Sequence, residues 1–393
     1  MRVLFLTPRA LGDARSGGTI KSAALLEHLE RAHAVDIACF VKPGEGWRRN
    51  AGRTVTIPLH RTRSLGRLVA SYAHRRPLSI ERNHSDEMSR AVGSLVATNR
   101  YDVVFVDGWL MAQYLPDGFG GWKLVHQHNA EHVMWERHAR LGTSALGRAV
   151  VGLEAARVRR YEGNILRRFD VVFAVSEQDR DALRSIAGRA DVRILPNVAD
   201  AALLERPALH PAQDPVVLFF GTLSWPPNLE GVTRFLRDGF PMLRWEIPGV
   251  RLLIAGAGAP ESLTTLAART PGVELIREAS DDEALYRRAR AFVDVGLGGS
   301  GTRVKILNAL ARGLPVVATA DAARGLDVTD GEHVLVGTGA SDVVRALALV
   351  LTDDGTWRTL SERGRALIRT RYIPEVAFSE LDDALATVRE LND

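Results

Sequence analysis

The chain is poor in cysteine and has no long apolar run, and both absences narrow what it can be. Cys39 is the only cysteine among 393 residues, which excludes a disulfide framework and a cysteine-rich zinc site. Apolar stretches such as Leu252–Ala259 are far shorter than the roughly 20 residues of a membrane span. The apolar run at the N-terminus is too short for a signal peptide. We therefore expect a soluble, cytoplasmic protein with no transmembrane segment.

Basic residues outnumber acidic residues only slightly. The sequence has 51 Lys and Arg against 47 Asp and Glu, a net charge of +4, which is small for a nucleic-acid binder. The basic residues gather in two stretches, Arg61–Arg90 and Arg137–Arg168, which lack the interleaved aromatic residues of single-strand nucleic-acid sites. We expect no nucleic-acid partner. The stretches are open to three interpretations: solvated helix faces, a peripheral surface for anionic lipid headgroups, or part of an acidic-substrate site.

Short β-branched apolar runs alternate with amphipathic helical segments along the chain, which predicts parallel sheets built from βαβ units. The rhythm begins at Val3–Thr7 and restarts at Val216–Phe220, so we expect two doubly wound α/β domains. Prolines in Asn197–Asp214 indicate the boundary. The predicted domains are residues 1–198 and 199–373, with a helix over 374–391 that could pack on either. The remaining predicted strands are Val35–Phe40, Val103–Val106, Leu124–Gln127, Val171–Val175, Arg193–Leu195, Arg251–Ala255, Glu274–Ile276, Ala291–Val295 and Pro315–Ala318.

Two glycine-rich loops follow predicted strands and precede predicted helices. Gly17 and Gly18 lie before a helix expected from about Thr19, where a ligand can approach the backbone and the helix N-terminus attracts an anion; a loop with only a structural role is the alternative. The stronger signal is the segment 298–317. Its glycines, Gly299 and Gly301, allow backbone N–H groups to converge on a phosphate.

Arg303 and Lys305 are expected in the first turn of the helix that follows this loop. Two cations at the positive end of a helix are unfavourable by themselves, so their placement indicates an anionic partner. Gly221 and Thr222 end the first strand of the second half, in the position that corresponds to the Gly17–Gly18 loop of the first half.

Histidines cluster after the strand that ends near Gln127. His126 and His128 are expected on one face of the strand end, which is where open α/β sheets bind ligands. This pattern favours a polar ligand-binding wall with one functional histidine, for which His128 is the candidate. Ordinary buried histidines and a metal pair formed by His128 and His132 are the alternatives.

Taken together, these segments resemble the GT-B glycosyltransferases, and specifically glycosyltransferase family 4. The resemblance covers nearly the whole chain and rests on seven segments in the order of the family. They are the Gly17–Gly18 loop, His128–Glu131, Phe173–Asp179, Leu195–Val198, Phe219–Thr222, Gly299–Lys305 and Ala309–Val317.

The resemblance implies two Rossmann-like domains that face each other across a cleft, with the last helix returning to the N-terminal domain. It implies that the C-terminal domain binds a nucleotide-diphosphate sugar as co-substrate. The N-terminal domain would bind a hydroxyl acceptor, which in this family is a glycan, a lipid-linked saccharide or a small molecule. The resemblance also implies transfer of a hexosyl group with retention of the anomeric configuration, and it implies that the reaction needs no metal ion and no cofactor.

For individual residues the resemblance implies roles around the departing diphosphate. Arg303 and Lys305 would neutralise its charge, and backbone N–H groups from Ser300 to Thr302 would assist. His128 would contact the transferred sugar, and Gly18 would lie against the donor phosphates. The residues that the resemblance places at the donor and nucleotide are Gly17, Gly18, Gly221, Thr222, Gly299, Ser300, Gly301, Thr302 and Asn308.

The chain also departs from the family. Ser300 and Asn308 stand where many members have two glutamates, and Thr222 follows Gly221 where members often have an arginine. One hypothesis is a dTDP-sugar donor, since an amide in place of a ribose-binding carboxylate costs less with deoxyribose. A second is a weakened relative that binds nucleotide or glycan without turnover. A nucleotide-sugar 2-epimerase would need more carboxylates around the cleft, and an NAD-type oxidoreductase would need a GxGxxG motif that neither half has.

Overall fold

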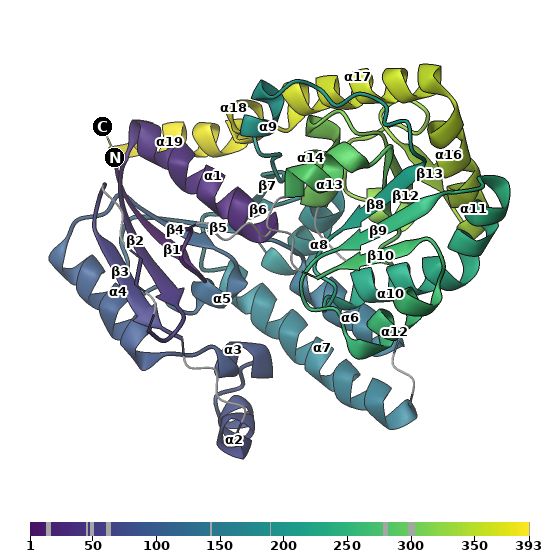
Figure 1. Ribbon diagram of the computed structural model, residues 1–393. Coiled ribbons are helices and arrows are strands. Elements are labelled where there is room, and N and C mark those ends of the chain that lie inside the picture. The colour runs from purple at the N-terminus through teal and green to yellow at the C-terminus, as the bar shows by residue number, and fades with distance from the viewer. Residues whose placement is uncertain are drawn as a thin grey trace. The chain divides into compact units, whose positions relative to one another are not determined.

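The computed structural model describes residues 1–12, 17–44, 46–47, 51–59, 64–141, 144–188, 190–277, 282–297 and 303–392. The chain divides into two compact units. The first unit consists of Met1–Pro196 and Ala377–Asp393, and the second of Asn197–Val376. Each unit has its own parallel sheet and its own buried apolar core (Figure 1). The predicted class of two Rossmann-like, doubly wound α/β domains is confirmed.

The first unit contains a seven-stranded sheet in the order β3-β2-β1-β4-β5-β6-β7. All of its strand pairs are parallel. Strands β4 and β6 are buried along their whole length, as expected for strands with helices on both faces. The strands are β1 (Arg2–Thr7), β2 (Ala34–Val41), β3 (Thr54–Pro58), β4 (Val103–Asp107), β5 (Trp122–His126), β6 (Val171–Ala174) and β7 (Asp191–Ile194).

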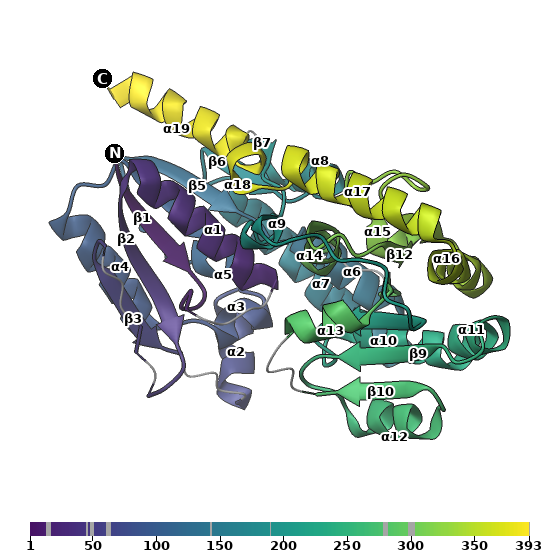
Figure 2. The same ribbon diagram turned by 45° about the horizontal axis from the view of Figure 1, so that its top comes forward.

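The helices of this unit follow the strands in sequence. They are α1 (Gly17–Ala32), α2 (Leu65–Ala73), α3 (Leu78–Arg82), α4 (Asp86–Thr98), α5 (Trp109–Ala112), α6 (Glu131–Leu141), α7 (Ala145–Leu166), α8 (Glu177–Ala187) and α19 (Ser379–Asn392). Helix α19 runs beside α1 in both ribbon views (Figures 1 and 2). His28 of α1 joins the two helices, because its Nε2 lies 2.7 Å from Oδ1 of Asp382.

The second unit contains a six-stranded parallel sheet in the order β10-β9-β8-β11-β12-β13. Its strands are β8 (Val216–Phe220), β9 (Arg251–Ala255), β10 (Val273–Ile276), β11 (Ala291–Asp294), β12 (Val316–Thr319) and β13 (Leu335–Gly337). Its helices are α9 (Ala202–Glu205), α10 (Pro226–Arg234), the π-helix η1 (Phe235–Gly239), α11 (Phe240–Glu246), α12 (Glu261–Arg269), α13 (Asp282–Arg288), α14 (Val304–Ala311), α15 (Ala320–Ala323), α16 (Ala340–Thr352) and α17 (Asp354–Arg371). The short helix α18 (Pro374–Ala377) begins in this unit, and its last residue, Ala377, belongs to the first unit.

Three elements differ from those predicted. Strands β3 and β13 were not expected, and each lies at an edge of its sheet. The helix predicted over 374–391 is two helices, α18 and α19, interrupted at Phe378. The Phe378 ring is fully buried and packs edge-on against His28 at 5.3 Å between ring centroids.

Among the described residues, no helix is long and apolar enough to cross a membrane.

Candidate functional site

Each sheet has one point at which its strand order reverses, and polar residues gather there. The reversal lies between β1 and β4 in the first unit and between β8 and β11 in the second. Ligands of open α/β sheets bind outside the carboxyl ends of the strands at such a point. In both units the second strand of the pair ends in a fully buried carboxylate, Asp107 in the first and Asp294 in the second. Each of these two residues is the centre of a candidate site in its own unit.

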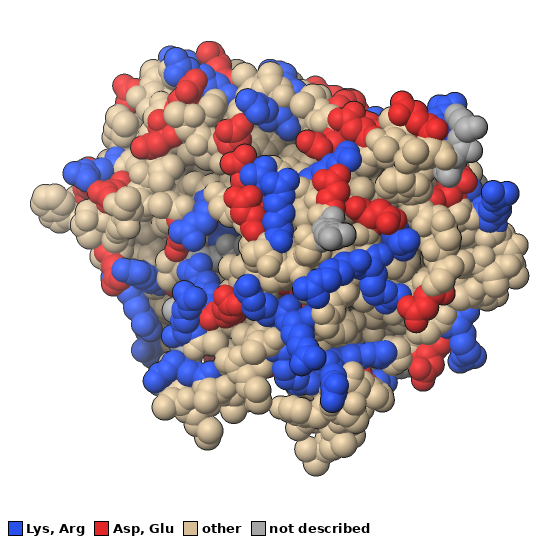
Figure 3. Space-filling view, turned by 180° about the vertical axis from the view of Figure 1, so that it is seen from behind, with Lys and Arg blue, Asp and Glu red and all other residues tan. Residues whose placement is uncertain are grey.

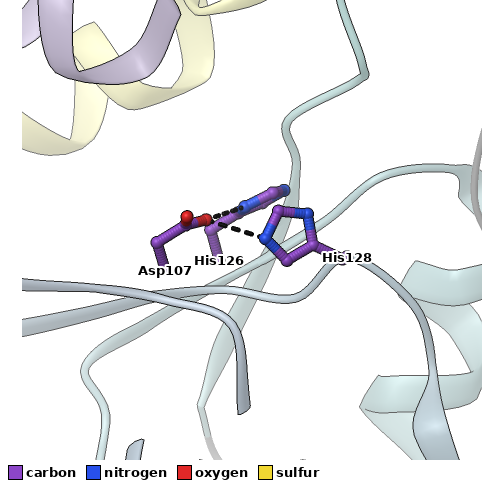
Figure 4. Close-up of side chains that lie close together, drawn as sticks. All are labelled: Asp107, His126 and His128. Carbon is purple, nitrogen blue, oxygen red and sulfur yellow. Dashed lines mark hydrogen bonds and ion pairs between the residues drawn. The ribbon is translucent and has the colours of Figure 1, made fainter. Parts of the chain in front are cut away.

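Asp107 is the shared partner of four side chains, two of which, His126 and His128, are drawn with it in Figure 4. Its Oδ1 lies 3.0 Å from Nδ1 of His126 and 3.0 Å from Nε2 of His128. Its Oδ2 accepts hydrogen bonds from Thr7 at 3.2 Å and from Ser22 at 2.5 Å. Burial by itself would raise the pKa of Asp107, but the charge of His128 and hydrogen bonds from both imidazoles hold that pKa well below its usual value. Asp107 is therefore a buried anion that orients both rings.

Lys21 lies on the other side of His126. Its Nζ is 2.7 Å from Nε2 of His126, and it also donates to the carbonyl oxygen of Leu195. Burial lowers the pKa of Lys21 well below its usual value, although the charge of Asp107 opposes the shift. Burial, followed by the charge of Lys21, likewise keeps the pKa of His126 well below normal. His126 is therefore neutral at pH 7, with Nδ1–H donating to Asp107 and Nε2 accepting from Lys21.

His128 lies in the segment between β5 and α6, and its side chain is 28% exposed. A glycine lets the ring come close to the end of β4: Gly108 has φ +90°, and a Cβ there would lie 3.3 Å from Cδ2 of His128. A partly exposed imidazole that a buried carboxylate holds in place can bind a hydroxyl group or transfer a proton.

Asp107, His126 and His128 are also the group of described residues that could hold a metal ion, since their ligand atoms all lie within 4.8 Å of one another. However, the ring nitrogens that would bind the metal lie at hydrogen-bonding distance from Asp107. Lys21 also brings an ammonium group to the same cluster. The residues therefore fit a hydrogen-bonded network better than a cation site.

His128 and His132 do not form the metal pair that was the alternative interpretation of the sequence. Helix α6 begins at Glu131, so His128 lies outside the helix. His132 is buried, and its Nδ1 lies 2.6 Å from Glu162 of α7. Glu162 also accepts backbone N–H groups of Glu131 at 3.0 Å and of His132 at 2.9 Å. Burial and then the charge of Glu162 raise the pKa of Glu131 to about 8.

In the second unit Lys305 reaches the strand-order reversal from α14. Its Nζ lies 2.9 Å from Oδ1 of Asp294, donates to Oδ1 of Asn228 at 2.9 Å, and stands 4.5 Å above the Phe219 ring. Burial lowers the pKa of Lys305, the charge of Arg303 adds to this shift, and Asp294 opposes it. Lys305 is thus a largely buried cation, 13% exposed, that its partners hold in a fixed place.

Glycine backbone at the strand ends lies directly beside these cations. A Cβ at Gly221 would be 3.1 Å from Nδ2 of Asn228 and 3.7 Å from Nζ of Lys305. A Cβ at Gly296 would be 3.2 Å from a guanidinium nitrogen of Arg303. Arg303 is the N-cap residue of α14, so it stands just before the first turn in which it was predicted. The carbonyl oxygen of Thr222 accepts from Asn228 at 2.9 Å.

The structure thus brings together Arg303, Lys305, Gly221 and Thr222 in the second unit. Oδ1 of Asn308 accepts the backbone N–H of Asp200 at 3.1 Å. Gly17 and Gly18 are the first residues of α1. The loop residues Gly299, Ser300, Gly301 and Thr302 lie outside the described residues.

Four participants were missed by reasoning from the sequence: Lys21, Asp107, Asn228 and Asp294. The two carboxylates did carry a signal. Each is a lone acidic residue at the carboxyl end of a continuous apolar strand, Val103–Val106 for Asp107 and Ala291–Val293 for Asp294. Lys21 and Asn228 carried none, because a single polar residue in a helix is ordinarily solvated.

Comparison with known proteins matches a glycosyltransferase family model to each unit. Residues 214–353 match the family described as "Glycosyl transferases group 1", and residues 16–198 match the "Glycosyl transferase 4-like domain". The chain belongs to the GT-B glycosyltransferases of group 1. The predicted resemblance to glycosyltransferase family 4 is confirmed.

This glycosyltransferase-family chain is also similar to individual proteins. An uncharacterized 44.6 kDa protein in the cps region of Klebsiella pneumoniae is 33% identical over 127 residues, which are 30% of this chain and 33% of that protein. Sucrose-phosphate synthase from Thermosynechococcus elongatus superposes with a TM-score of 0.73 at 18% identity, covering 99% of both chains. Anabaena HepE in complex with UDP and glucose gives 0.68 at 15% identity, covering 98% of this chain and 100% of HepE. At such identities these structures show the fold alone.

Proposed function

We propose that this protein transfers a hexosyl group from a nucleotide-diphosphate sugar to a hydroxyl acceptor, namely a glycan, a lipid-linked saccharide or a small molecule. The proposed reaction retains the anomeric configuration and uses neither a metal ion nor another cofactor. The observation that carries the proposal is the pair of cations, Arg303 and Lys305, at the strand-order reversal of the second unit. The complex of the similar HepE with UDP and glucose supports a donor of this class.

The charge arrangement suits a departing diphosphate. Transfer of the sugar leaves negative charge on the diphosphate oxygens, and fixed cations in a partly desolvated site stabilise such charge more than solvated ones do. Lys305 is held by Asp294 and Asn228, so it need not be ordered when the donor binds. Arg303 beside Gly296 supplies a second positive charge.

In the first unit, His128 is the candidate for contact with the transferred sugar. Asp107 positions this ring, and Lys21 acts on it only through His126 and Asp107. We therefore assign Asp107, His126 and Lys21 as positioning residues. Asp107→Asn should lower kcat about a hundredfold or more if His128 takes part in transfer, whereas KM for the donor should change much less. Asp36→Asn is the matched control, since Asp36 is another buried carboxylate of this unit, bound by Arg2 and Tyr101.

The deciding experiment is a calorimetric titration of the protein with UDP, GDP, ADP and dTDP. We expect micromolar affinity for one nucleotide, and a loss of at least tenfold, about 1.4 kcal/mol, in Lys305→Ala. Lys123→Ala, which removes a lysine of the first unit paired with Asp170, should bind like the wild type. Tight binding of dTDP would support the deoxyribose hypothesis. Absence of binding to all four nucleotides would overturn the proposed donor site.

Retention and independence from metal are tested on the reaction itself. The anomeric proton of the product, followed by NMR from the first turnovers, should have the configuration of the donor. Activity should survive dialysis against EDTA. An inverted product or a chelator-sensitive rate would each contradict that part of the proposal.

A second candidate function is binding of a nucleotide or glycan without turnover. It is favoured by Asn308, which replaces a glutamate of the family and holds the backbone N–H of Asp200. On this alternative the titration gives the same nucleotide affinity, but neither sugar transfer nor slow hydrolysis of the matching nucleotide sugar is detected. Asn308→Glu should then restore turnover if the missing carboxylate is the cause.

A further inference from the structure

Helix α2 carries an apolar face that faces solvent. The face consists of Leu65, Leu68, Val69 and Tyr72, which are 81%, 38%, 67% and 53% exposed. Their spacing of three and four residues places them on one side of the helix. The helix is ordered locally, since Ser64 caps its N-terminus by accepting from Arg67. We call these four residues the α2 face.

Helix α7 has a similar face in its first three turns. Leu146, Val150 and Leu153 are 77%, 61% and 56% exposed, and their spacing again puts them on one side. The side chain of Ser144 caps this helix by accepting from Gly147. We call these three residues the α7 face. Contiguous apolar side chains at a protein surface can mark an interaction site.

The two helices are fixed to each other in the first unit. Arg157 of α7 stacks its guanidinium 4.2 Å from the centroid of the Tyr72 ring. The same group donates to the carbonyl oxygens of Ser71 at 2.8 Å and of Arg76 at 2.6 Å. The α2 face and the α7 face are therefore held by one set of contacts rather than on independent segments.

Positive charge surrounds both faces. Residues 64–84 contain four arginines and one glutamate, and that glutamate, Glu81, is buried with its carboxylate near Arg67 and His74. Figure 3 shows tan projections at the lower edge, where Figure 1 draws α2 and the start of α7, with blue side chains gathered above them. The exposed arginines of α7, of its neighbour α6 and of residues 64–84 are Arg75, Arg82, Arg140, Arg148, Arg159 and Arg160.

We propose that the α2 face and the α7 face dock this protein on an anionic lipid bilayer. Apolar side chains that enter the headgroup region, with arginines beside them at the phosphates, are the pattern of helices that lie on membranes. Each basic residue near such a surface contributes attraction that falls off within a Debye length. A bilayer also fits the shape, because two convex projections sink into a deformable surface, whereas a protein partner would need a matching hollow for each.

The test measures sedimentation of the whole protein with vesicles of phosphatidylcholine, with and without phosphatidylglycerol, and with no donor present. We expect binding only when phosphatidylglycerol is included, and loss of binding at high salt. Leu65→Ser/Val69→Ser and Leu146→Ser/Val150→Ser should each weaken partitioning at least tenfold. Arg75→Gln/Arg82→Gln should weaken it as well.

Matched controls come from the second unit. Trp245→Ser removes an apolar side chain that is 88% exposed on α11, and Arg363→Gln removes an exposed arginine on α17; neither should change partitioning. Equal partitioning of the wild type and the double serine variants would overturn the proposal. Binding to vesicles of phosphatidylcholine alone that does not change with salt concentration would overturn it as well. If a second copy of the chain covers these faces instead, light scattering should show a dimer for the wild type and a monomer for the serine variants. That result would also overturn the proposal. Nucleotide affinity is measured separately, so failure of the proposed donor site would not affect this result.

Discussion

The ammonium group of Lys21 lies 2.7 Å from Nε2 of His126, and both side chains are fully buried. Lysine is almost never fully buried without partners. Here its partners are a neutral imidazole, the Leu195 carbonyl oxygen and, through His126, the carboxylate of Asp107. The pair fixes which nitrogen of His126 carries the proton, so Nδ1–H of His126 donates to Oδ1 of Asp107, the oxygen that also lies 3.0 Å from Nε2 of His128.

Lys21→Met should show how far the protonation of His126 and the stability of the first unit depend on Lys21. The change leaves Nε2 of His126 and the Leu195 carbonyl without their donor, so the free energy of unfolding should fall by about 1–3 kcal/mol. The pKa of His126 should rise, because the charge of Lys21 helps to lower it. Chemical denaturation and an NMR titration of the histidines measure the two effects. Lys123→Met, at a partly exposed pair, should cost only about 0–1 kcal/mol. An unchanged His126 titration would contradict the role of Lys21.

Gly108→Ala and Gly118→Ala form a matched pair. Both glycines have positive φ, +90° and +81°, so alanine should cost about 1–3 kcal/mol at either position. Only at Gly108 would the new Cβ meet His128, at 3.3 Å from Cδ2, whereas nothing lies within 4 Å at Gly118. Displacement of His128 should lower kcat about tenfold or more in Gly108→Ala. Equal kcat in the two variants would show that the position of His128 does not matter for transfer.

The affinity for nucleotide should depend on the charge of Lys305. Burial lowers the pKa of this lysine, so its proton is lost at a lower pH than from a solvated lysine. As pH rises through that lowered pKa, the cation disappears and the Kd for the preferred nucleotide should increase. Lys305→Arg keeps its charge throughout, because the guanidinium pKa exceeds about 12. Calorimetry between pH 7 and pH 10 should therefore give a steeper loss of affinity for the wild type than for Lys305→Arg. Parallel curves would exclude Lys305 as the titrating group.

Stability should change with pH through Glu131. Its folded pKa is about 8, whereas its usual value is 4.5, so the folded state binds more protons between these two values. Stability from this group is therefore complete below about pH 4.5 and falls as pH rises to about 8. Glutamine at position 131 stays neutral at every pH. The Tm of Glu131→Gln minus the Tm of the wild type should therefore increase as pH rises through this window. Glu246→Gln, at an exposed site on α11, should show no such trend. A constant Tm difference for Glu131→Gln would contradict the raised pKa.

Most of the fold was predictable because the strands that build it are buried on both faces and read as continuous apolar runs. Edge strands lack that signal. β3 has a single buried residue, Ile57, and β13 is three residues long, so neither stands out from a loop. The interruption between α18 and α19 was equally invisible. It occurs at Phe378, whose apolar side chain fits a continuous amphipathic helix but packs instead on His28, a residue 350 positions earlier.

The sequence by itself determined where the polar and glycine-rich segments stand, namely after the strands, and therefore that His128, Gly221, Arg303 and Lys305 belong to strand ends. Only the tertiary structure decided which of them meet. Asp107 and His126 are neighbours because β4 and β5 pair in that register, and Lys305 meets Asp294 because α14 returns over β11. Hydrophobic periodicity is a local property of the chain, whereas strand order and register join residues far apart in sequence. The buried ion pairs and hydrogen bonds of the site depend on those junctions, since a charge is buried only where its partner already lies.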